Sequence, residues 1–422
     1  MDAIILTAGK ATRLYPVTKS IPKPLMPIAG SPLICHILDA LSANVNHVII
    51  VIGHKADLVK DMINRMNYPF KIDWVVQQEQ LGTGHAVKIC ERYIDSDVFF
   101  MMYGDIFTSQ QVINEIILLG QESDHRRGIF SAKKVTNPEK YGCLEIEGDN
   151  LVKILEKHPQ PPSSYINAGM MVLPSTIFDY LTHTPKSTRG EIELTDSINQ
   201  LIQDGFSFFI YNIKDHWIDI GYPWDLLTAN EIGMKKQNFP KITSPSSVAL
   251  EGPCKITESV TLRPGTFIHG PVVIEENVIV GPNCFIRPST YLGKNVHIGN
   301  AVEIKNSIIL DNTIIGHLSY VGDSVIGKNC NFGAGTKVAN LRFDKKDIYM
   351  TIKGERISSG RKKLGIFMGD SVKTGINVSL MPGITIGENS QIGAHTLVNQ
   401  NISPNTLFYY DPKEGNVQKP LQ

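Results

Sequence analysis

The stretch "FIHGPVVIEENVIVGPNCFIRPSTYLGKNVHIGN", residues Phe267–Asn300, decides the fold of the second half of the chain. An aliphatic residue recurs in it at every sixth position, from Ile268 to Ile298. A period of six fits neither an α-helix nor an ordinary hairpin, but it fits a parallel β-helix whose short strands each point one aliphatic residue inward. The stretch therefore predicts a β-helix.

The same period extends on both sides of this stretch. The series runs through Leu250, Ile256, Leu262, Ile268, Ile274, Val280, Ile286, Leu292, Ile298 and Ile304. After one dropped residue it resumes at Ile309, Ile315 and Val321, after a second at Ile326, Phe332 and Val338, and a last run covers Met368, Thr374, Leu380, Ile386, Ile392 and Val398. We expect the β-helix over 249–403, with an excursion at about 341–365 and a tail over 404–422. Glycines and asparagines in "GPN", "GKN" and "GEN" are expected to supply positive φ at the corners. The pattern alone also fits an inert spacer or a trimerisation rod.

The first half, residues 1–235, alternates short β-rich runs with helical stretches. "DAIIL", "HVIIVIG" and "KIDWVVQ" read as strands, with "LICHILDALSA" and "ADLVKDMINRM" as helices between them. This alternation predicts an α/β domain with a Rossmann-like, mostly parallel sheet covered on both faces. Ligands of such sheets bind at the carboxyl ends of the strands. A linker is expected over 236–248.

Composition and net charge limit the kinds of molecule that the protein is expected to bind. The 422 residues carry 41 Lys and Arg against 41 Asp and Glu, so no overall field favours nucleic acid or an anionic membrane. The six cysteines lie far apart without a C-x-x-C pair, which is typical of reduced residues in a cytoplasmic protein. The longest apolar runs are too short to span a membrane. We expect a soluble, untargeted protein of two domains with small-molecule partners.

The loop "LTAGKATRLYPVTKSIPKPL", Leu6–Leu25, has the composition of a phosphate-binding segment. Backbone N–H groups around Gly9 can approach an anion closely, and Arg13 and Lys23 can neutralise a triphosphate as it is attacked. A plain strand-to-helix turn with two solvated cations fits the same residues. Ala11 stands where a second glycine would make a tighter cradle. If its φ is positive, alanine costs roughly 1 kcal/mol there.

Three further stretches bear on the front half. "QQEQLGTGHAV" has Gly82 and Thr83 after amide-rich residues, which suits recognition of a base edge by hydrogen bonds. "MMYGDIFT" leads to Asp105 and "HWIDIGYPWDL" contains Asp219, each next to a short strand. One or two carboxylates together with substrate phosphates form the usual Mg²⁺ site. Either aspartate alone is more often a turn or cap residue.

Taken in order, these segments resemble the nucleotidyltransferase domain of sugar-1-phosphate nucleotidylyltransferases over nearly all of residues 1–230. The family's loop reads L-A-x-G-x-G-T-R-[LM] and is followed by P-K-[PA]-[LM]; this chain has "LTAGKATRL" and "PKPL". The resemblance implies in-line attack of a sugar-1-phosphate oxygen on the α-phosphorus of UTP or dTTP, with pyrophosphate leaving. Arg13 and Lys23 would be catalytic, and Asp105 and Asp219 would carry Mg²⁺. The implied nucleotide-binding residues are Leu6, Ala8, Gly9, Gln77, Gly82 and Thr83, and the implied sugar-phosphate residues are Gly142, Glu156, Lys157 and Asn167.

Several residues of the predicted β-helix are not what a plain rod needs. Lys305 follows Arg287 by eighteen residues, three hexads and one full coil, so the two cations should stack on one face. The same count brings His317 and Tyr320 near their level. Stacked cations suit a phosphate, and a neutral imidazole suits a general base. A solvated rod surface with an incidental histidine is the plainer interpretation.

Here "VEIKNS", "GHLSYVGD", "NFGAGT" and "VANLRFD" resemble the acetyltransferase half of the bifunctional enzyme that makes UDP-N-acetylglucosamine. The resemblance implies a left-handed β-helix of hexapeptide repeats and a homotrimer with each site between neighbouring chains. His317 would be the base for the amino group of an amino-sugar-1-phosphate attacking the co-substrate acetyl-CoA, and Ala334 would border the thioester. The implied substrate residues are Arg287, Lys305, Tyr320, Asn331, Asn340 and Lys346. The basic excursion "IYMTIKGERISSGRKKLG" and the tail depart from the bacterial pattern, and the excursion is more similar to archaeal relatives.

The sequence thus predicts a cytoplasmic bifunctional enzyme that acetylates an amino-sugar-1-phosphate and then uridylylates it. One alternative is a nucleotidylyltransferase whose β-helix is structural or regulatory, against which Lys305 and His317 argue. Another is a non-catalytic subunit, which predicts loss of Arg13, Lys23 or the aspartates. All four are present.

Overall fold

The computed structural model describes residues 1–123, 125–240 and 245–421, and the chain forms two compact units. The first comprises Met1–Lys10, Pro22–Leu25 and Pro32–Asp219, and the second comprises Ala11–Ile21, Met26–Ser31 and Ile220–Gln422. The predicted functional boundary near residue 235 stays a prediction. Over the described residues, no helix combines the length and the apolar character needed to cross a membrane.

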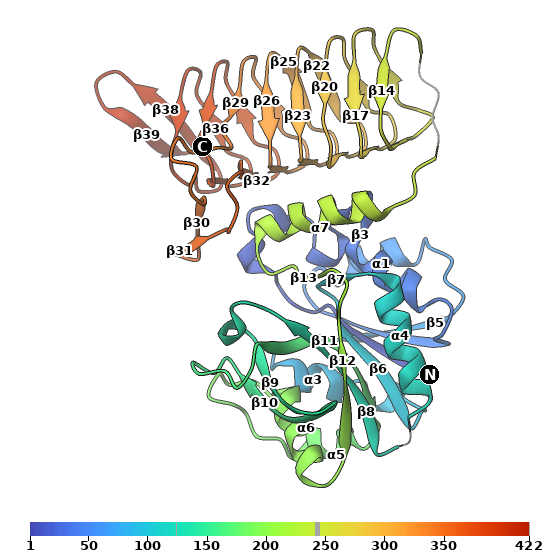
Figure 1. Cartoon of the computed structure of the whole chain (residues 1–422). Coiled ribbons are helices and arrows are strands. Elements are labelled where there is room, and N and C mark those ends of the chain that lie inside the picture. The colour runs from blue at the N-terminus through green and yellow to red at the C-terminus, as the bar shows by residue number, and fades with distance from the viewer. Residues whose placement is uncertain (124, 241–244, 422) are drawn as a thin grey trace. The chain divides into compact units, whose positions relative to one another are not determined.

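A nine-stranded mixed sheet forms the centre of the first unit (Figure 1). In spatial order its strands are β5 (Lys71–Val76), β4 (His47–Ile52), β1 (Asp2–Leu6), β6 (Val98–Tyr103), β11 (Tyr165–Pro174), β8 (Arg127–Lys134), β12 (Ser207–Asn212), β10 (Asn150–Glu156) and β9 (Gly142–Glu147). The first four are parallel to one another, whereas β11 runs antiparallel to both β6 and β8. The predicted α/β class with a Rossmann-like mixed sheet is confirmed.

Helices cover both faces of this sheet. Along β1, Ala3 and Ile5 pack into one apolar cluster with α1 and α4, and Ile4 packs into another with α3, α5 and α6. The α-helices are α1 (Leu33–Leu41), α2 (Ala56–Ile63), α3 (Thr83–Lys88), α4 (Gln110–Gln121), α5 (Ile177–His183), α6 (Leu194–Gln203) and, in the second unit, α7 (Pro223–Lys236). Short 3₁₀ helices are η1 (Thr12–Leu14) and η2 (Val17–Lys19) in the second unit, and η3 (Lys23–Leu25), η4 (Glu91–Tyr93) and η5 (Pro138–Lys140) in the first. Two small ribbons pair β2 (Pro27–Ile28) with β3 (Ser31–Pro32) and β7 (Ile106–Thr108) with β13 (Trp217–Asp219).

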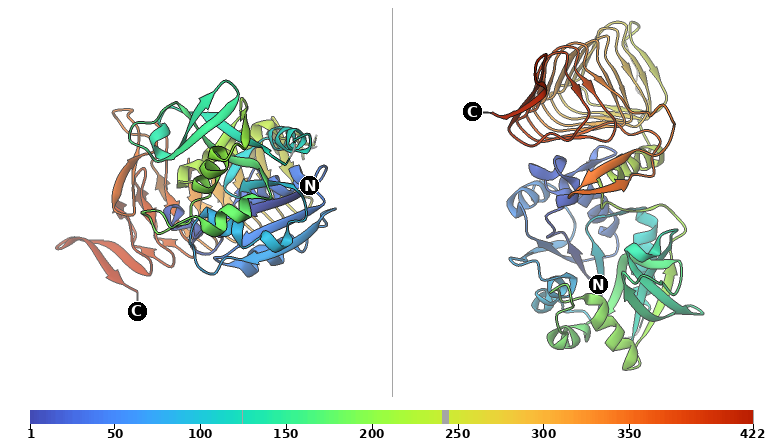
Figure 2. Two further views of the ribbon diagram at one scale, coloured as in Figure 1. Left: turned by 90° about the horizontal axis from the view of Figure 1, so that it is seen from below. Right: turned by 90° about the vertical axis from the view of Figure 1, so that its left-hand side faces the viewer.

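The second unit contains a three-sided parallel β-helix, whose coils stack one on the next in Figure 2. One side consists of β14 (Ala249–Glu251), β17 (Phe267–His269), β20 (Phe285–Ile286), β23 (Glu303–Lys305), β26 (Tyr320–Gly322), β29 (Lys337–Val338), β34 (Ser379–Leu380) and β37 (Leu397–Val398). The second consists of β15 (Cys254–Ile256), β18 (Val272–Ile274), β21 (Thr290–Leu292), β24 (Ile308–Ile309), β27 (Val325–Ile326), β32 (Phe367–Met368) and β35 (Thr385–Ile386). The third consists of β16 (Thr261–Leu262), β19 (Ile279–Val280), β22 (His297–Asn300), β25 (Ile314–His317), β28 (Asn331–Phe332), β33 (Lys373–Thr374), β36 (Gln391–Ile392), β38 (Thr406–Asp411) and β39 (Gly415–Pro420).

The register follows the sequence period, including its interruptions. Phe285 pairs with Glu303, eighteen residues later, whereas Tyr291 pairs with Ile308, seventeen residues later, where one residue drops out of the series. The inward aliphatic positions form one continuous buried core from Ile268 to Val398. Leu250, Ile256 and Leu262, in the first coil, are only partly buried.

Asparagines more than glycines provide the positive φ at the corners. Asn283, Asn295 and Asn389, the third residues of "GPN", "GKN" and "GEN", have φ of 54°, 59° and 60°. Gly387 is instead required by close approach, because a Cβ there would lie 2.4 Å from the backbone nitrogen of Pro404 in the next coil. The glycines of these corners therefore mostly make room for stacking.

The predicted excursion contains an antiparallel hairpin of β30 (Tyr349–Ile352) and β31 (Glu355–Ser358) (Figure 1). Ile348, Met350 and Ile352 are buried, so the hairpin has an apolar face. In the tail, β38 and β39 form a second hairpin that extends the third side of the β-helix.

Candidate active sites

The loop after β1 and the residues after β6 meet at the carboxyl ends of two neighbouring strands. Leu6 pairs with Tyr103, and the N–H of Gly104 donates to the carbonyl of Leu6 at 2.9 Å. A Cβ at Gly104 would lie 2.5 Å from Thr7 Cγ2, so only glycine lets the two segments approach so closely. Asp105 follows this glycine directly. The sheet therefore places the predicted loop and the predicted metal ligand together.

Lys23 and the two predicted metal-binding aspartates lie at the same edge of the first unit. Lys23 Nζ contacts Asp105 Oδ2 at 2.7 Å, with 13% of the lysine side chain exposed. Asp219 pairs with Ile106, the residue after Asp105, in the β7–β13 ribbon. The ribbon thus brings the two carboxylates to neighbouring positions.

The donor chemistry fits Mg²⁺. Carboxylate oxygens are its preferred protein ligands, and one or two of them suffice when substrate phosphates and waters complete the shell. Asp105 already holds a cation, the ammonium of Lys23. No cluster of three or more His, Cys, Asp or Glu with metal-binding geometry occurs in the part of the chain that the structure describes. An all-protein metal cage is therefore not the type of site found among these residues.

Contacts fix the backbone of the loop at Ala8, whereas the space beside Gly9 is open. Gln80 Nε2 donates to the carbonyl of Ala8 at 2.9 Å, and a Cβ at Gly53 would lie 2.7 Å from the same oxygen. A Cβ built on Gly9 meets nothing within 4 Å, so the space beside this residue is open. In the second unit, Ala11 has φ 49° and ψ 40°, and the guanidinium of Arg13 lies 5.5 Å from the ring centroid of Tyr222.

The predicted base-binding residues surround the start of α3. Gln77 is buried, and its Nε2 lies 3.1 Å from the carbonyl of Gly82 and 3.1 Å from His85 Nδ1. Gly82 has φ 99°, and a Cβ there would lie 2.6 Å from the carbonyl oxygen of Ile192. The structure therefore brings Gln77, Gly82 and Thr83 together.

The predicted sugar-phosphate residues lie on β9, β10 and β11. Gly142 pairs with Glu156, and a Cβ at Gly142 would lie 2.8 Å from Glu156 Oε1. Burial raises the pKa of Glu156, although Arg189, 3.9 Å away, opposes this effect. Lys157, next in the chain, has φ 45°.

Tyr103 ends β6 next to Gly104 and Asp105 and was not predicted. Burial raises the pKa of its phenol, and the side chains of Asn167, on the sugar side, and Thr83, on the base side, oppose this effect. Asn167 Oδ1 also accepts from the N–H of Gly169 at 2.8 Å. Tyr103 ends the apolar strand "DVFFMMY", where nothing in the sequence separates it from an ordinary core residue.

The two predicted cations of the β-helix do stack. The N–H of Arg287 donates to the carbonyl of Ile304, so Arg287 lies one coil away from Lys305. Both line a pocket of about 610 Å³. Arg287 Nη1 contacts Glu303 Oε1 at 2.7 Å. The predicted level of Tyr320 is also correct, because Tyr320 pairs with Glu303 in the adjacent coil.

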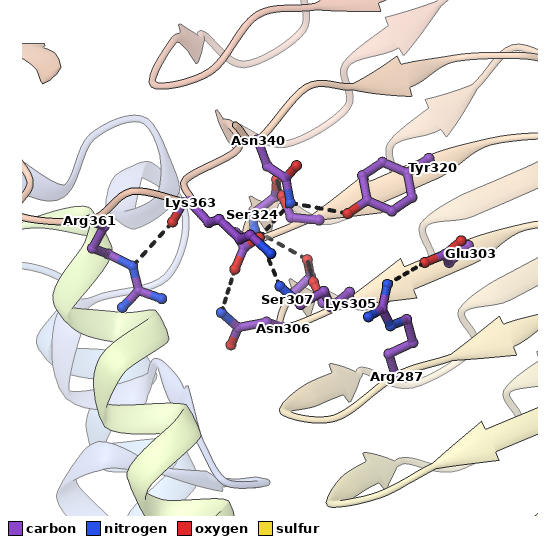
Figure 3. A network of polar contacts seen from close by, with 12 residues as sticks. Arg287, Glu303, Lys305, Asn306, Ser307, Tyr320, Ser324, Asn340, Arg361 and Lys363 are labelled. Atoms are coloured by element: carbon purple, nitrogen blue, oxygen red, sulfur yellow. Dashed lines mark hydrogen bonds and ion pairs between the residues drawn. The ribbon is translucent and has the colours of Figure 1, made fainter. Parts of the chain in front are cut away.

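Two polar residues missed by the sequence reasoning, Asn306 and Asp323, line the same pocket. Arg361, Lys362 and Lys363 from the end of the excursion complete one side of it. Figure 3 shows that Lys305, Asn306, Tyr320 and Asn340 converge from successive coils.

The remaining predicted residues lie away from this pocket within one chain. His317 is exposed at the end of β25 and pairs with Asn300, and Asn331 is exposed on β28, one coil further. The carbonyl of Ala334 accepts from the N–H of Asn377 at 2.8 Å, and Lys346 is exposed in the excursion. None of these four lines the pocket, and Tyr320 and Asn340 are not among its lining residues either.

Three family models match the chain in succession. Residues 2–236 match "Nucleotidyl transferase", residues 268–366 match "GMPPB C-terminal domain", and residues 365–400 match "Bacterial transferase hexapeptide (six repeats)". The first covers more than half of the chain. A solved structure of a putative glucose-1-phosphate thymidylyltransferase from Bacillus anthracis, 28% identical, covers 57% of this chain and 98% of its own with a TM-score of 0.50.

Curated relatives match over nearly the whole length. The "Bifunctional protein GlmU" of Methanococcus maripaludis is 43% identical, with 97% of each chain covered. A "Bifunctional sugar-1-phosphate nucleotidylyltransferase/acetyltransferase" of Sulfurisphaera tokodaii is 38% identical, covering 97% of this chain and all of its own. With a nucleotidyltransferase sheet and a hexapeptide β-helix in one chain, this protein is a bifunctional enzyme of nucleotidyl and acetyl transfer and belongs to the family of archaeal GlmU proteins.

Proposed function

We propose that the β-helix acetylates glucosamine-1-phosphate, or a related amino-sugar-1-phosphate, with acetyl-CoA, and that the first half then transfers UMP from UTP to the product. The products are UDP-N-acetylglucosamine and pyrophosphate, with dTTP as the alternative nucleotide. The observation that carries this proposal is the stacking of Arg287 over Lys305 in a chain that also pairs Lys23 with Asp105.

In the front site, catalysis rests on position and charge. Lys23 and Arg13 neutralise the triphosphate, and the backbone around Gly9 accommodates it. Gln77, Gly82 and Thr83 hold the base, with Leu6 and Ala8 beside them. Gly142, Glu156, Lys157 and Asn167 bind the sugar phosphate. Asp105 and Asp219 would hold Mg²⁺, which neutralises charge on the phosphates when bound.

In the back site, the amine of the sugar attacks the thioester carbonyl of acetyl-CoA. The new C–N bond forms as the C–S bond breaks, and His317 takes the proton from the attacking nitrogen and returns it to the departing sulfur, so that coenzyme A leaves as the thiol. Arg287 and Lys305 bind the phosphate, and Tyr320, Asn331, Asn340 and Lys346 contact the sugar. Ala334 borders the thioester.

The separation of His317 from the cationic pocket within one chain favours a site completed by a neighbouring copy. We therefore propose a homotrimer in the cytoplasm, with the acetyl-transfer sites between chains. Sedimentation of the purified protein measures the number of chains directly, and a stable monomer with full acetyl transfer would contradict this arrangement.

The test of the function follows the two products separately. The protein is incubated with glucosamine-1-phosphate, acetyl-CoA, UTP and Mg²⁺, and free thiol and pyrophosphate are measured over time. We expect thiol release without UTP, and pyrophosphate release with N-acetylglucosamine-1-phosphate in the absence of acetyl-CoA. Release of pyrophosphate without any release of thiol would indicate a nucleotidylyltransferase whose β-helix is structural.

A further inference from the structure

Asp323 is a buried carboxylate that lines the cationic pocket. It follows Gly322 in "YVGD" at the end of β26, with φ 52°, and its side chain is only 2% exposed. Burying an ionised carboxylate is costly unless hydrogen bonds and a counter-charge satisfy it. The partners of Asp323 therefore indicate what this carboxylate holds in place.

Three side chains from neighbouring coils converge on Asp323. Asn340 Nδ2 donates to Oδ2 at 2.5 Å, and Asn306 Nδ2 donates to Oδ1 at 2.7 Å. Lys305 Nζ lies 3.4 Å from Oδ2. Lys305 and Asn340 are two of the residues assigned above to the amino-sugar phosphate, so the carboxylate holds two of the proposed substrate-binding side chains.

The carboxylate also decides which way the amide of Asn340 faces. An ionised carboxylate only accepts hydrogen bonds, so it fixes Nδ2 of Asn340 toward itself. The same Nδ2 lies 3.1 Å from the hydroxyl of Tyr320. Both amide hydrogens are then used within the protein, and the amide oxygen of Asn340 is left to accept from a ligand. Because Tyr320 accepts from Asn340, its own hydroxyl proton is available for donation.

Gly322 makes room for this arrangement. A Cβ at Gly322 would lie 2.6 Å from Asn340 Nδ2 and 2.6 Å from the hydroxyl of Tyr320. The backbone fixes the same level, since Gly365 N–H donates to the carbonyl of Asp323 at 2.8 Å and Leu364 N–H to that of Asn340 at 3.0 Å. The end of the excursion is thereby joined to the two residues that face each other.

We propose that Asp323 is the positioning residue of the acetyl-transfer site, holding the Lys305 ammonium and orienting Asn340 so that its oxygen and the Tyr320 hydroxyl face the amino-sugar phosphate. This inference rests on the proposed acetyl transfer. It assigns Asp323 no contact with the reacting atoms. Its effect on the reaction passes through the three side chains that it holds.

The test is the isosteric change Asp323→Asn, which removes the charge and lets the amide of Asn340 turn. We expect the KM for glucosamine-1-phosphate to rise about 10- to 100-fold, the range of a lost hydrogen bond to a charged group, with the KM for acetyl-CoA unchanged. The matched control is Asp311→Asn, because Asp311 pairs with Lys328 at 3.2 Å on the same β-helix outside the pocket. The control is expected to leave both KM values unchanged.

A second variant protects the test against misfolding. Gly322→Ala keeps every charge but displaces Asn340 and Tyr320, so the same selective rise in KM is expected. A folded Asp323→Asn enzyme with an unchanged KM for the sugar phosphate would overturn the inference. So would an equal rise in the KM of both substrates in both variants, since that is what general loosening of the β-helix produces.

Calorimetry separates this inference from the function on which it rests. Glucosamine-1-phosphate alone is titrated into wild type, Asp323→Asn and Asp311→Asn. Binding weakened only by Asp323→Asn supports the positioning role even if wild type releases no thiol, in which case the acetyl transfer alone is wrong. Absence of any binding to wild type would overturn both.

Discussion

Ala11 carries a Cβ at a backbone conformation that favours glycine. Its φ of 49° lies in the left-handed region, where a Cβ costs roughly 1 kcal/mol relative to glycine. The condition under which the sequence assigned a cost to this alanine, a positive φ, is therefore met. The carbonyl of Ala11 accepts from Leu14 N–H at 3.0 Å and from the Thr18 hydroxyl at 3.1 Å, which holds the strained conformation in place.

The first prediction concerns this strain. Ala11→Gly should keep nucleotidyl transfer or raise it by no more than about tenfold, because the strain of roughly 1 kcal/mol is smaller than the about 1.4 kcal/mol that a tenfold change represents. Arg13→Ala should cost far more, since it removes a charge aimed at the transition state. Steady-state pyrophosphate release measures both. An active wild type that tolerates Arg13→Ala would show that the loop does not grip phosphates.

The second prediction concerns Asp105. Asp105→Asn should lower nucleotidyl transfer by orders of magnitude, because it weakens the clamp on the metal and removes the partner of Lys23, 2.7 Å away. Acetyl transfer should survive both this change and a chelator. Thiol release that falls on addition of EDTA would contradict the assignment of the metal to the first half.

At the scale of the element, β25 illustrates why the fold of the second half could be predicted. Ile315 points inward and is fully buried, whereas its neighbour Ile314 is 42% exposed. Because each short strand points one side chain into the core, the period of six is written directly in the sequence, although strands such as β24 also bury the outward residue, Ile308. The eighteen-residue length of one coil also predicted that Arg287 stacks over Lys305.

The polar centre of the pocket could not be predicted in this way. Asp323 stands at a corner of positive φ, where many β-helices carry an aspartate or asparagine for the turn alone. Its role depends on Asn340, which reaches it from the next coil, and no spacing rule identifies a side chain that turns inward toward a carboxylate. The sequence did not predict Tyr103 as a site residue for a related reason, because a hydroxyl at the end of an apolar strand gives no periodic signal.

The third prediction tests the inward and outward positions of β25. Ile315→Ala should lower the free energy of unfolding of the β-helix by about 2–5 kcal/mol, because it leaves a cavity in a continuous core. Ile314→Ala, the matched control on the same strand, should change it by about 0.5 kcal/mol or less. Denaturant titration monitored by circular dichroism gives both values. Equal losses would show that the outward face of β25 is covered too.

At the scale of the whole molecule, the two chemistries draw on separate sets of residues. Lys23, Asp105 and Asp219 belong to the first compact unit, and His317, Arg287 and Lys305 belong to the β-helix of the second. Arg13, assigned to nucleotidyl transfer, is also in the second unit but outside the β-helix. The activities should therefore fail independently.

The fourth prediction follows from this separation. His317→Ala should abolish thiol release, because no other base is assigned to the amine, and leave pyrophosphate release from N-acetylglucosamine-1-phosphate nearly unchanged. The two rates are measured on the same purified variant, with its number of chains checked by sedimentation. Loss of both activities in a folded variant with the wild-type number of chains would refute the assignment of two sites.

The stacked register of the β-helix also restricts how such a chain can change in length. Because Phe285 pairs with Glu303, eighteen residues on, an insertion of one whole coil keeps every later side chain on its own side of the triangle. An insertion of one hexad would instead turn all later residues onto the next side, carrying Tyr320 away from the level of Arg287. Viable insertions and deletions in this half should come as whole coils or bulge out at corners. The excursion that returns at Gly365 beside Asp323 is a long insertion of the second kind.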